Sequence, residues 1–366
     1  MDHNFYSLSV KSVHNETEDA VTLTFDIPTE LSDTFKYTQG QYLTLKFELN
    51  GEEVRRSYSM CSSPIDPGIA VTVKRVEGGL VSTHINNKLK GGDIVDVMPP
   101  DGRFFTPLKE ENRKTYYLFA AGSGITPLLS IIKTIVEKEP QSSIHLLYGN
   151  RRESGIIFKA SLDQLEKRYA GQLTVTHILS QPKREKSKGV FGLLSKGSLS
   201  WRGLVGRIDA QRTTAFLEEN PASSKLAEYF ICGPGEMIDI VENTLVNKGI
   251  DKANIHTERF TTAVIKEEDR AKGTAGAQLT VHLNGQKIEA EVPEGKTVLD
   301  VLLAAKKDPP YSCTSGACST CMAKLIKGTV KMDVCYALDD EEIADGYILT
   351  CQAHPTSDEL EVTFEV

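Results

Sequence analysis

Four cysteines near the C-terminus have a spacing that predicts an iron–sulfur site. Cys313, Cys318 and Cys321 follow one another as C-x4-C-x2-C, and Cys351 comes 30 positions after Cys321. This spacing is typical of [2Fe–2S] centres, in which four thiolates bind two irons. The residues between the first three cysteines are all Gly, Ala, Ser or Thr. Small residues let backbone N–H groups approach the sulfides, so the loop suits a binuclear cluster.

A zinc site is the alternative for the same residues, because four cysteine thiolates also suit tetrahedral Zn²⁺. Zinc ribbons usually combine two short C-x2-4-C pairs, whereas here only Cys351 comes from outside the loop. The spacing favours the cluster. The zinc alternative would make the protein a non-enzymatic interaction module. Cys335 falls outside the pattern, and we expect a core or surface thiol there.

A second set of candidate residues follows a predicted strand that ends near Val54. Its sequence is Arg56-Ser57-Tyr58-Ser59. Arg56 and Tyr58 are two positions apart, so both side chains point to one face of an extended chain. A guanidinium can bind a phosphate through two hydrogen bonds, and a phenol ring can stack on a flat heterocycle. Ser59 adds a donor for a ring nitrogen. The tetrapeptide alone also fits an exposed arginine beside a core tyrosine.

Paired glycines follow the predicted strand at residues 71–76, which contains Lys74. Gly78 and Gly79 precede Leu80-Val81-Ser82, where a helix is expected to begin. Backbone amides at such a helix start can meet a pyrophosphate. A simple hairpin or helix-start turn is the other interpretation of these glycines.

A third glycine-rich turn follows a buried strand predicted at residues 116–121. Gly122 and Gly124 permit a tight turn, and the next helix, predicted at 127–137, offers unpaired N–H groups to an anionic phosphate. Thr126 lies in the same turn, and Pro127 fits the first helical position. Pro127 also replaces the third glycine of the Rossmann fingerprint. An ordinary strand–helix turn is the alternative interpretation.

Two later strand ends belong to the same predicted sheet. One is Tyr148-Gly149-Asn150-Arg151, and the other is Cys232-Gly233-Pro234. In open parallel sheets ligands bind beyond the carboxyl ends of the strands. We therefore expect Asn150, Arg151, Gly233 and Pro234 to contact a cofactor, although Cys232 alone would be interpreted as a small buried hydrophobe.

The third strand end concerns the choice of nucleotide. Ser180, Lys183 and Arg184 follow the strand predicted at 173–179, and no acidic residue lies in that turn. Cations there suit a 2′-phosphate, which favours NADPH over NADH. The alternative is that the Lys-rich loop is merely solvated, so NADH stays possible.

The surrounding sequence predicts the elements that position these residues. Up to about Phe105, short alternating apolar segments with Gly, Pro and Asp between them predict an antiparallel β-barrel or sandwich. From Thr115, apolar strands alternate with helices, which predicts an α/β domain with a parallel sheet. The domains expected are a β-barrel at 1–106, an α/β domain at 107–264, a linker at 265–277 and an α+β domain at 278–366.

The charge of the chain is concentrated at its C-terminal end. The formal net charge is −8, from 42 Lys and Arg against 50 Asp and Glu. Residues 274–366 contain 15 acidic and 7 basic residues, whereas the first 273 contain 35 of each. This asymmetry predicts a separate acidic module. The basic surface of a nucleic-acid-binding protein is missing, so no nucleic-acid partner is expected.

The N-terminus and the hydrophobic pattern bear on location. Met1-Asp2-His3-Asn4 has neither the basic start nor the apolar run of a signal peptide, and no stretch approaches 18 uninterrupted apolar residues. With an odd number of cysteines, a disulfide framework is not expected. We therefore expect a cytoplasmic location and no membrane partner.

Taken in order, these segments resemble the ferredoxin–NADP reductase superfamily followed by a plant-type, β-grasp-like ferredoxin domain. The RSYSMCSSP, GNR and ERF segments look most like the branch of phenylacetyl-CoA epoxidase reductase components. The motifs that carry the resemblance are Gly40-Gln41-Tyr42, Arg56 to Ser59, Phe119 to Pro127, Cys232 to Met237, Pro310 to Cys313, Leu338-Asp339-Asp340 and Gly346 to Cys351.

The resemblance implies roles for individual residues. Tyr58 and Ser59 would face the flavin ring, with FAD favoured over FMN, and Cys232 would lie beside the reacting carbon of the nicotinamide. Phe260 is a candidate to cover the flavin ring. The residues expected to bind the flavin phosphates are Arg56, Lys74, Gly79, Val81 and Ser82.

The same resemblance implies an electron path. Electrons would pass from NAD(P)H through the flavin to the [2Fe–2S] cluster, and then to a partner oxygenase. The acidic C-terminal module would dock on a basic patch of that oxygenase. Another oxygenase or a hybrid-cluster protein is the alternative client.

Overall fold

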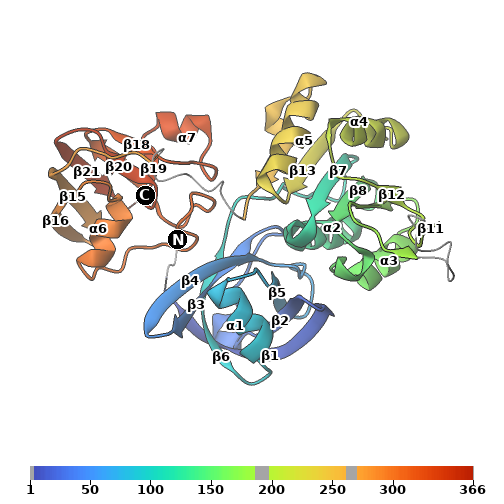
Figure 1. Ribbon diagram of the computed structural model, residues 1–366, viewed down its shortest axis with the longest axis horizontal. Coiled ribbons are helices and arrows are strands. Elements are labelled where there is room, and N and C mark those ends of the chain that lie inside the picture. Colours follow the sequence, from blue (N-terminus) through green and yellow to red (C-terminus); the bar gives the residue numbers. More distant parts are fainter. Residues whose placement is uncertain (1–3, 186–197, 261–269, 366) are drawn as a thin grey trace, which may run out of the picture. The chain divides into compact units, whose positions relative to one another are not determined.

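The computed structural model describes residues 4–185, 198–260 and 270–365 (Figure 1). Contacts divide the chain into two compact units. One contains most of residues 4–258, and the other contains residues 259–366 together with residues 55–57. Each unit is described separately below. Within the described residues, no helix is long and apolar enough to cross a membrane.

The first part of the larger unit is a six-stranded antiparallel sheet with the order β4-β3-β6-β1-β2-β5. Met60, just after β4, forms a bridge with Val71 of β5, which brings the two edge strands together. Apolar residues at alternate positions, such as Leu43 and Leu45, fill the interior. The elements are β1 Tyr6–Thr17, β2 Ala20–Asp26, β3 Tyr42–Leu49, β4 Glu52–Ser59, β5 Ile69–Lys74, α1 Leu80–Lys88 and β6 Ile94–Asp101.

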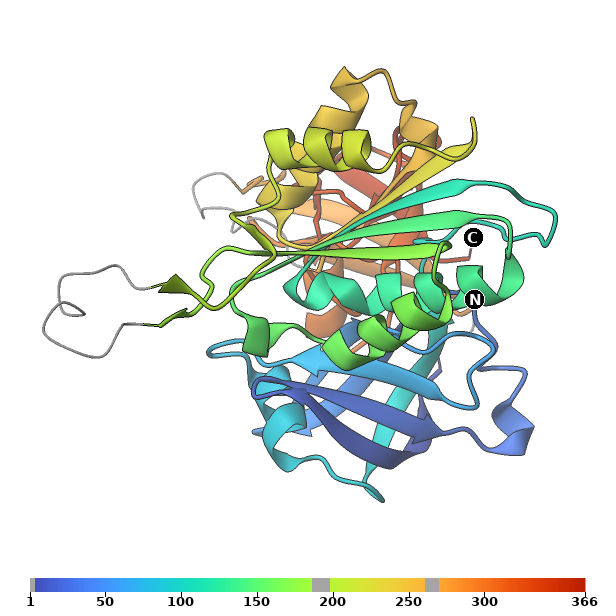
Figure 2. The same ribbon diagram turned by 90° about the vertical axis from the view of Figure 1, so that its right-hand side faces the viewer.

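The second part of the larger unit is a parallel sheet with the order β12-β9-β8-β7-β13-β14. Helices α2 and α3 cover one face, and α4 and α5 cover the other (Figure 2). The elements are β7 Thr115–Ala121, α2 Ile125–Lys138, β8 Ser143–Asn150, α3 Lys159–Arg168, β9 Leu173–Leu179, β12 Leu204–Val205, α4 Ala210–Glu219, β13 Ala227–Cys232, α5 Gly235–Asn247 and β14 Ile255–Glu258.

The strand order places the ligand-binding edge of this sheet. The chain runs from β7 outward through β8 to β9 and later returns to the other side of β7 as β13. Such a reversal leaves a crevice at the carboxyl ends of the central strands, where ligands bind in open α/β sheets. The predicted parallel sheet is therefore confirmed, and its reversal lies between β7 and β13.

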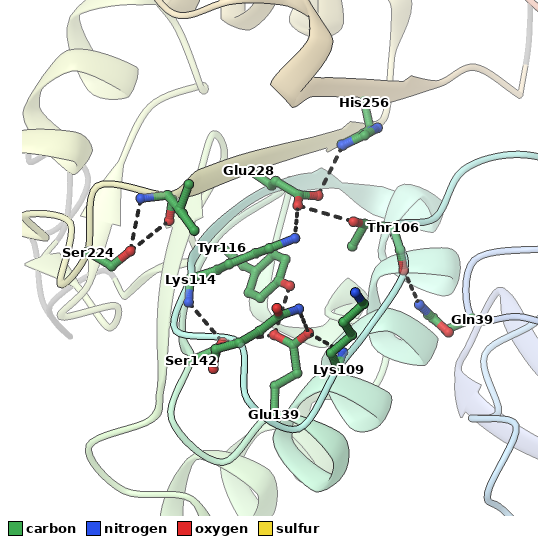
Figure 3. Close-up of polar contacts among 12 residues, drawn as sticks. Gln39, Thr106, Lys109, Lys114, Tyr116, Glu139, Ser142, Ser224, Glu228 and His256 are labelled. Carbon is green, nitrogen blue, oxygen red and sulfur yellow. Dashed lines mark hydrogen bonds and ion pairs between the residues drawn. The ribbon is translucent and has the colours of Figure 1, made fainter.

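A buried polar network holds the segment between the barrel and this sheet (Figure 3). Glu228 accepts hydrogen bonds from Lys114 at 2.5 Å and from Thr106 at 3.1 Å. Glu139, which is fully buried, accepts from the Tyr116 hydroxyl at 2.9 Å and from the Lys109 N–H at 3.0 Å. Because buried carboxylates are costly to leave unpaired, these bonds fix the course of residues 106–114.

The C-terminal unit contains a five-stranded sheet with the order β16-β15-β21-β17-β19 and a two-stranded sheet of β18 and β20. Two helices accompany the sheets. The elements are β15 Ala277–Leu283, β16 Gln286–Val292, α6 Val298–Ala304, β17 Met322–Lys327, β18 Val330–Met332, α7 Asp340–Ala344, β19 Tyr347–Leu349, β20 Ala353–Pro355 and β21 Glu359–Thr363.

Two connecting segments, the Lys-rich loop after β9 and the predicted linker, are only partly described. In the Lys- and Ser-rich stretch at 181–197, β10 (Arg184–Glu185) pairs with β11 (Ser198–Leu199), and residues 186–197 lie outside the described residues. Residues 265–269 of the predicted linker also lie outside them. The rest of the linker packs on the C-terminal unit, where the Ala271 N–H donates to Asp333 at 2.7 Å and the Thr274 N–H donates to the Pro355 carbonyl at 2.7 Å.

Candidate functional site

The turn after β7 and the end of β13 pack directly on each other. A Cβ atom added at Gly124 would overlap the carbonyl group of Cys232, and one added at Gly233 would lie 3.2 Å from the Ala121 Cβ. Only glycine at position 124 therefore permits this approach. The packing brings Gly122, Gly124 and Cys232 to one edge of the sheet, as the sequence predicted.

The ends of β8 and β9 meet at the same edge. The Ser180 N–H donates to the Asn150 carbonyl at 3.0 Å, and the Gln181 N–H donates to the Arg151 carbonyl at 2.8 Å. Arg151 and Arg184 are exposed to solvent. These strand ends thus place cationic side chains where an additional phosphate of a nucleotide could be bound.

Unpaired hydrogen-bond donors at this edge of the sheet also suit a bound nucleotide. The Nδ2 atom of Asn150 is buried and has no hydrogen-bond partner among the described residues. Gly122 has φ +57°, and the short 3-10 turn Gly122–Gly124 leads into α2 with no side-chain cap. The first N–H groups of a helix have no partner within it. A bound phosphate or amide would satisfy these donors.

One prediction about this turn differs from the structure in detail. Pro127 is the third residue of α2, not the first. Proline is tolerated there because the N–H groups of the first helical turn lack an intrahelical acceptor. The Thr126 hydroxyl donates to the Ser123 carbonyl at 3.0 Å, so it stabilises the turn itself.

The barrel residues predicted to bind a flavin lie on and after β4. Arg56 is exposed, Tyr58 is half-buried, and Ser59 is buried. Lys74, at the end of β5, lies 3.6 Å from the carboxylate of Asp19. Arg56 and Tyr58 share a face of the strand, which suits a phosphate and a ring bound side by side.

The start of α1 provides backbone donors. Gly78 has φ +72°, and Gly79 is the N-cap of α1 without a side-chain cap. A Cβ atom at Gly79 would lie 2.6 Å from the Ser82 hydroxyl, which itself accepts from the Val76 N–H at 3.1 Å. Val81 and Ser82 are buried in this turn. Backbone N–H groups, not the Ser82 hydroxyl, are therefore the donors open to a pyrophosphate.

A carboxylate that sequence reasoning missed joins the two candidate sites. The Ser59 hydroxyl donates to Glu258 at 2.9 Å, and parallel pairing places Glu258 beside Cys232. Burial raises the pKa of Glu258 to about 8, although the hydrogen bond from Ser59 acts to lower this pKa. Burial, with the Glu258 charge as a second cause, raises the pKa of Cys232. The thiol is therefore neutral near pH 7. A carboxylate at the end of a strand was the available signal.

Phe260 lies two residues beyond β14 and is 36 % exposed. Its predicted contact with a flavin ring stays a prediction.

The four cysteines of the C-terminal unit form two pairs. Cys313 contacts Cys318, and Cys321 contacts Cys351. Among the described residues, no group of three or more His, Cys, Asp or Glu side chains is arranged so that it could hold a single metal ion. Two pairs fit two irons with two thiolates each. Contact with Cys318 is the main cause that lowers the pKa of Cys313.

Backbone and amide donors surround these thiols. The Ser315 N–H lies 3.4 Å from the Cys313 sulfur, and the Gln352 Nε2 lies 3.5 Å from the Cys351 sulfur. Gly316 has φ +71°, and a Cβ atom there would lie 2.8 Å from the Val334 carbonyl oxygen. The loop therefore suits a buried, negatively charged cluster.

Three protein-family models match successive parts of the chain. An oxidoreductase FAD-binding domain matches residues 7–106, an oxidoreductase NAD-binding domain matches residues 118–243, and a 2Fe-2S iron-sulfur cluster binding domain matches residues 281–356. The iron–sulfur interpretation of the cysteine spacing is thereby confirmed, and the zinc alternative was wrong.

Characterised relatives cover nearly the whole chain. It is 36 % identical over 363 residues to one component of the 1,2-phenylacetyl-CoA epoxidase of Escherichia coli, covering 99 % of this chain and 98 % of that protein. It is 34 % identical over 370 residues to the ferredoxin reductase component of 3-ketosteroid-9-alpha-monooxygenase from Rhodococcus rhodochrous, covering 98 % and 96 %.

Solved structures share the fold. Phthalate dioxygenase reductase, described as a modular structure for electron transfer from pyridine nucleotides to [2Fe–2S], covers 98 % of each chain with a TM-score of 0.59 and 23 % identity. With its FAD-binding, NAD-binding and [2Fe–2S] domains in this order, the chain belongs to the ferredoxin–NADP reductase superfamily, in the family of iron–sulfur flavoprotein reductases that deliver electrons to oxygenases.

Proposed function

We propose that this reductase takes electrons from NADPH and delivers them to an oxygenase of the phenylacetyl-CoA epoxidase type. The observation that carries the choice of client is the 36 % identity to a component of that enzyme over almost the full length of both chains. When bound, FAD accepts electrons from the nicotinamide in pairs and releases them singly to the [2Fe–2S] cluster. The protein supplies position, charge and exclusion of water.

The flavin is bound by the barrel. Arg56 and the N–H groups of Leu80 to Ser82, which follow the Gly79 N-cap, hold its phosphates, with Lys74 nearby, while Tyr58 stacks on the ring. Ser59 and its partner Glu258 lie 2.9 Å apart and provide a hydroxyl and a protonatable carboxyl at the end of β4. Because burial raises the pKa of Glu258 to about 8, this carboxyl can keep its proton at neutral pH.

Replacement of Tyr58 tests this assignment. A Tyr58→Ala protein is expected to lose bound FAD or to reduce its flavin more slowly with NADPH, since the stacking surface is removed. Flavin content and the rate of flavin reduction after rapid mixing are measured. Normal values for both in the variant would show that Tyr58 has another role.

The nicotinamide nucleotide is bound at the carboxyl edge of the parallel sheet. The residues that hold it are Gly122, Gly124, Thr126, Asn150, Arg151, Ser180, Arg184, Gly233 and Pro234, with Cys232 at the reacting end. NADPH is preferred because Arg151, directly after β8, and Arg184, in β10 beyond the end of β9, are exposed. In an Arg184→Ala variant the KM for NADPH should rise while that for NADH stays unchanged. An equal change for both nucleotides would contradict the preference.

The cluster is held by Cys313, Cys318, Cys321 and Cys351, and electrons leave near α7. Four exposed acidic residues lie on or beside this helix, and the adjacent Leu338 packs with Cys321 and Cys351. The four acidic residues steer a basic surface of the oxygenase toward the cluster. They are Asp339, Asp340, Glu341 and Asp345.

The docking surface is tested by matched charge removal. The Asp340→Asn, Glu341→Gln double variant should reduce the oxygenase more slowly and with a weaker salt dependence. Glu291→Gln, Glu294→Gln removes the same charge beside β16, at the other edge of the sheet, and should behave like the wild type. Ferricyanide reduction by NADPH should change little with ionic strength in all three proteins. An equal effect of the two double variants would contradict this docking site.

The client is tested by reconstitution. The purified reductase is combined with the oxygenase components of phenylacetyl-CoA epoxidase, and NADPH oxidation that depends on phenylacetyl-CoA is measured. The second candidate client is a 3-ketosteroid monooxygenase, because the identity to its reductase component is 34 % over 370 residues. Turnover with the steroid system alone would replace the first client by the second. A third client, such as another oxygenase or a hybrid-cluster protein, is indicated if neither turns over.

We place this activity in the cytoplasm. The support is chemical: thiolate ligands and the free thiols of Cys61 and Cys232 persist in a reducing compartment. Fractionation of cells with an antibody against the chain tests this location, and recovery outside the cytoplasmic fraction would contradict it.

A further inference from the structure

A buried tyrosine contacts the backbone of the glycine turn after β7. The Tyr148 side chain is fully buried within β8, and its ring lies 5.7 Å from that of His177. Its hydroxyl donates to the Gly122 carbonyl at 3.0 Å. Burial raises the pKa of this hydroxyl, so the proton that makes the hydrogen bond stays in place near neutral pH.

This hydrogen bond acts where the turn has few other constraints. A Cβ atom at Gly122 would have no atom within 4 Å, so side-chain packing does not hold the residue at its φ of +57°. The Gly122 carbonyl also accepts from the Ile125 N–H. Two donors on one carbonyl oxygen use both of its lone pairs and fix its direction.

The direction of one carbonyl determines that of the next N–H. A trans peptide is planar, so its C=O and N–H bonds point to opposite sides. With the Gly122 carbonyl turned toward Tyr148, the Ser123 N–H is turned away from it. That N–H belongs to the first groups of the helical start, which have no acceptor within the helix.

We propose that Tyr148 is a positioning residue for the nicotinamide nucleotide, because its hydroxyl fixes the Gly122–Ser123 peptide plane and thereby aims the Ser123 N–H at a phosphate of the nucleotide. This inference rests on the proposed function of the turn. It concerns a side chain that does not itself face the ligand.

The test compares two tyrosines of one sheet. Tyr148→Phe removes the hydroxyl beside the turn. Tyr117→Phe removes the hydroxyl that donates to the Asn220 carbonyl at 2.7 Å, and Tyr117 packs on the opposite face of the sheet. The control therefore loses the same kind of bond away from the turn.

The KM for NADPH, with ferricyanide as acceptor, should rise about 3- to 10-fold in Tyr148→Phe, the loss expected for one hydrogen bond. Flavin reduction at saturating NADPH should stay within about twofold of wild type, since the hydroxyl does not face the reacting atoms. Tyr117→Phe should leave both values within about twofold.

Ligand-dependent stability gives a readout apart from turnover. A fixed concentration of NADP⁺ raises Tm through binding to the folded state. This rise should be smaller in Tyr148→Phe than in wild type and Tyr117→Phe, even if both variants have a lower Tm without nucleotide. Equal KM values and equal NADP⁺ shifts for the two variants would overturn the inference.

A third variant separates this inference from the proposed function. Alanine at Gly124 must displace the turn, because its Cβ would overlap the Cys232 carbonyl. If Gly124→Ala raises KM and Tyr148→Phe does not, only the role of Tyr148 fails. If Gly124→Ala binds NADPH like the wild type, the turn is not the nucleotide site.

Discussion

Helices at the candidate cofactor turns of the larger unit begin differently from those of the C-terminal unit. Helices α1, α2 and α5, which start at the candidate cofactor turns, have Gly79, Gly124 and Pro234 as N-caps and no side-chain cap. Helices α6 and α7 of the C-terminal unit both start with a capping box, led by Thr297 and Asp339. Uncapped starts leave N–H donors for an anionic ligand, whereas capped starts satisfy them internally.

The difference extends to how each site is built. The proposed nucleotide site offers mainly backbone groups, so it depends on conformation and on close packing of turns. The proposed cluster site offers four thiols, so it depends on the identity of side chains. Substitutions should therefore affect the two sites through different causes, and the following experiments separate these causes in order of expected effect.

The largest effect should come from a thiol. Cys321→Ser replaces a buried thiol that we propose as a ligand, so the protein should lose its [2Fe–2S] absorption and the ability to reduce the oxygenase. Reduction of ferricyanide by NADPH should fall far less, because it depends on the other unit. Iron content, visible spectra and both activities are measured. A retained cluster would show that Cys321 is not a ligand.

Two glycines with left-handed backbone give the next comparison. Alanine costs about 1 kcal/mol at such a φ, so Gly122→Ala should lower the free energy of unfolding by about that amount. Gly316→Ala adds a clash, since its Cβ would lie 2.8 Å from the Val334 carbonyl oxygen. It should therefore also lower the iron content of the purified protein. Equal iron content in both variants would mean that the cluster loop tolerates displacement.

The half-buried carboxyl of Glu258 predicts a pH dependence. In the folded chain burial raises the pKa of Glu258 to about 8, well above its ordinary value of 4.5. The folded state therefore binds the proton more tightly than the unfolded state, and stability falls as pH rises from about 4.5 through about 8. The free energy of unfolding, measured by denaturation across this pH range, should change less with pH in Glu258→Gln than in the wild type. The control Glu219→Gln, at an exposed position, should show the same pH dependence of stability as the wild type. The same pH dependence in Glu258→Gln would contradict the raised pKa of Glu258.

The smallest effect should come from a helix cap. Thr297 and Asp300 exchange hydrogen bonds at 3.1 Å in each direction at the start of α6. Thr297→Ala should destabilise the C-terminal unit by about 1 kcal/mol and leave NADPH binding unchanged. Chemical denaturation measures the loss. A changed KM for NADPH would show that the two units are coupled through more than electron transfer.

The same difference explains what could be predicted from sequence. Thiol spacing alone predicted an iron–sulfur domain and pointed to Cys313, Cys318, Cys321 and Cys351 as its ligands, because side-chain identity can be read from the sequence. The alternation of strands and helices predicted the parallel sheet, and the convergence of its turns followed from topology.

Other features depend on contacts between distant residues. Glu258 gains its raised pKa only through burial and through Ser59, which lies 199 positions away. The bond from Tyr148 to Gly122 depends on the register of β7 and β8. No local pattern marks such pairs, so they could not be found before the fold was known.

The pairing of β13 and β14 limits how the length of this chain can vary. Cys232 lies opposite Glu258 because four successive residue pairs align the two short strands. One extra residue in the connection 248–254 that slipped this register would turn the carboxyl to the other face of the sheet. An insertion at 221–226, before β13, would lengthen a mostly exposed loop at the amino end of that strand, away from Cys232, and leave the pairing intact. Homologues and engineered variants should therefore differ in length at residues 221–226 far more often than at residues 248–254.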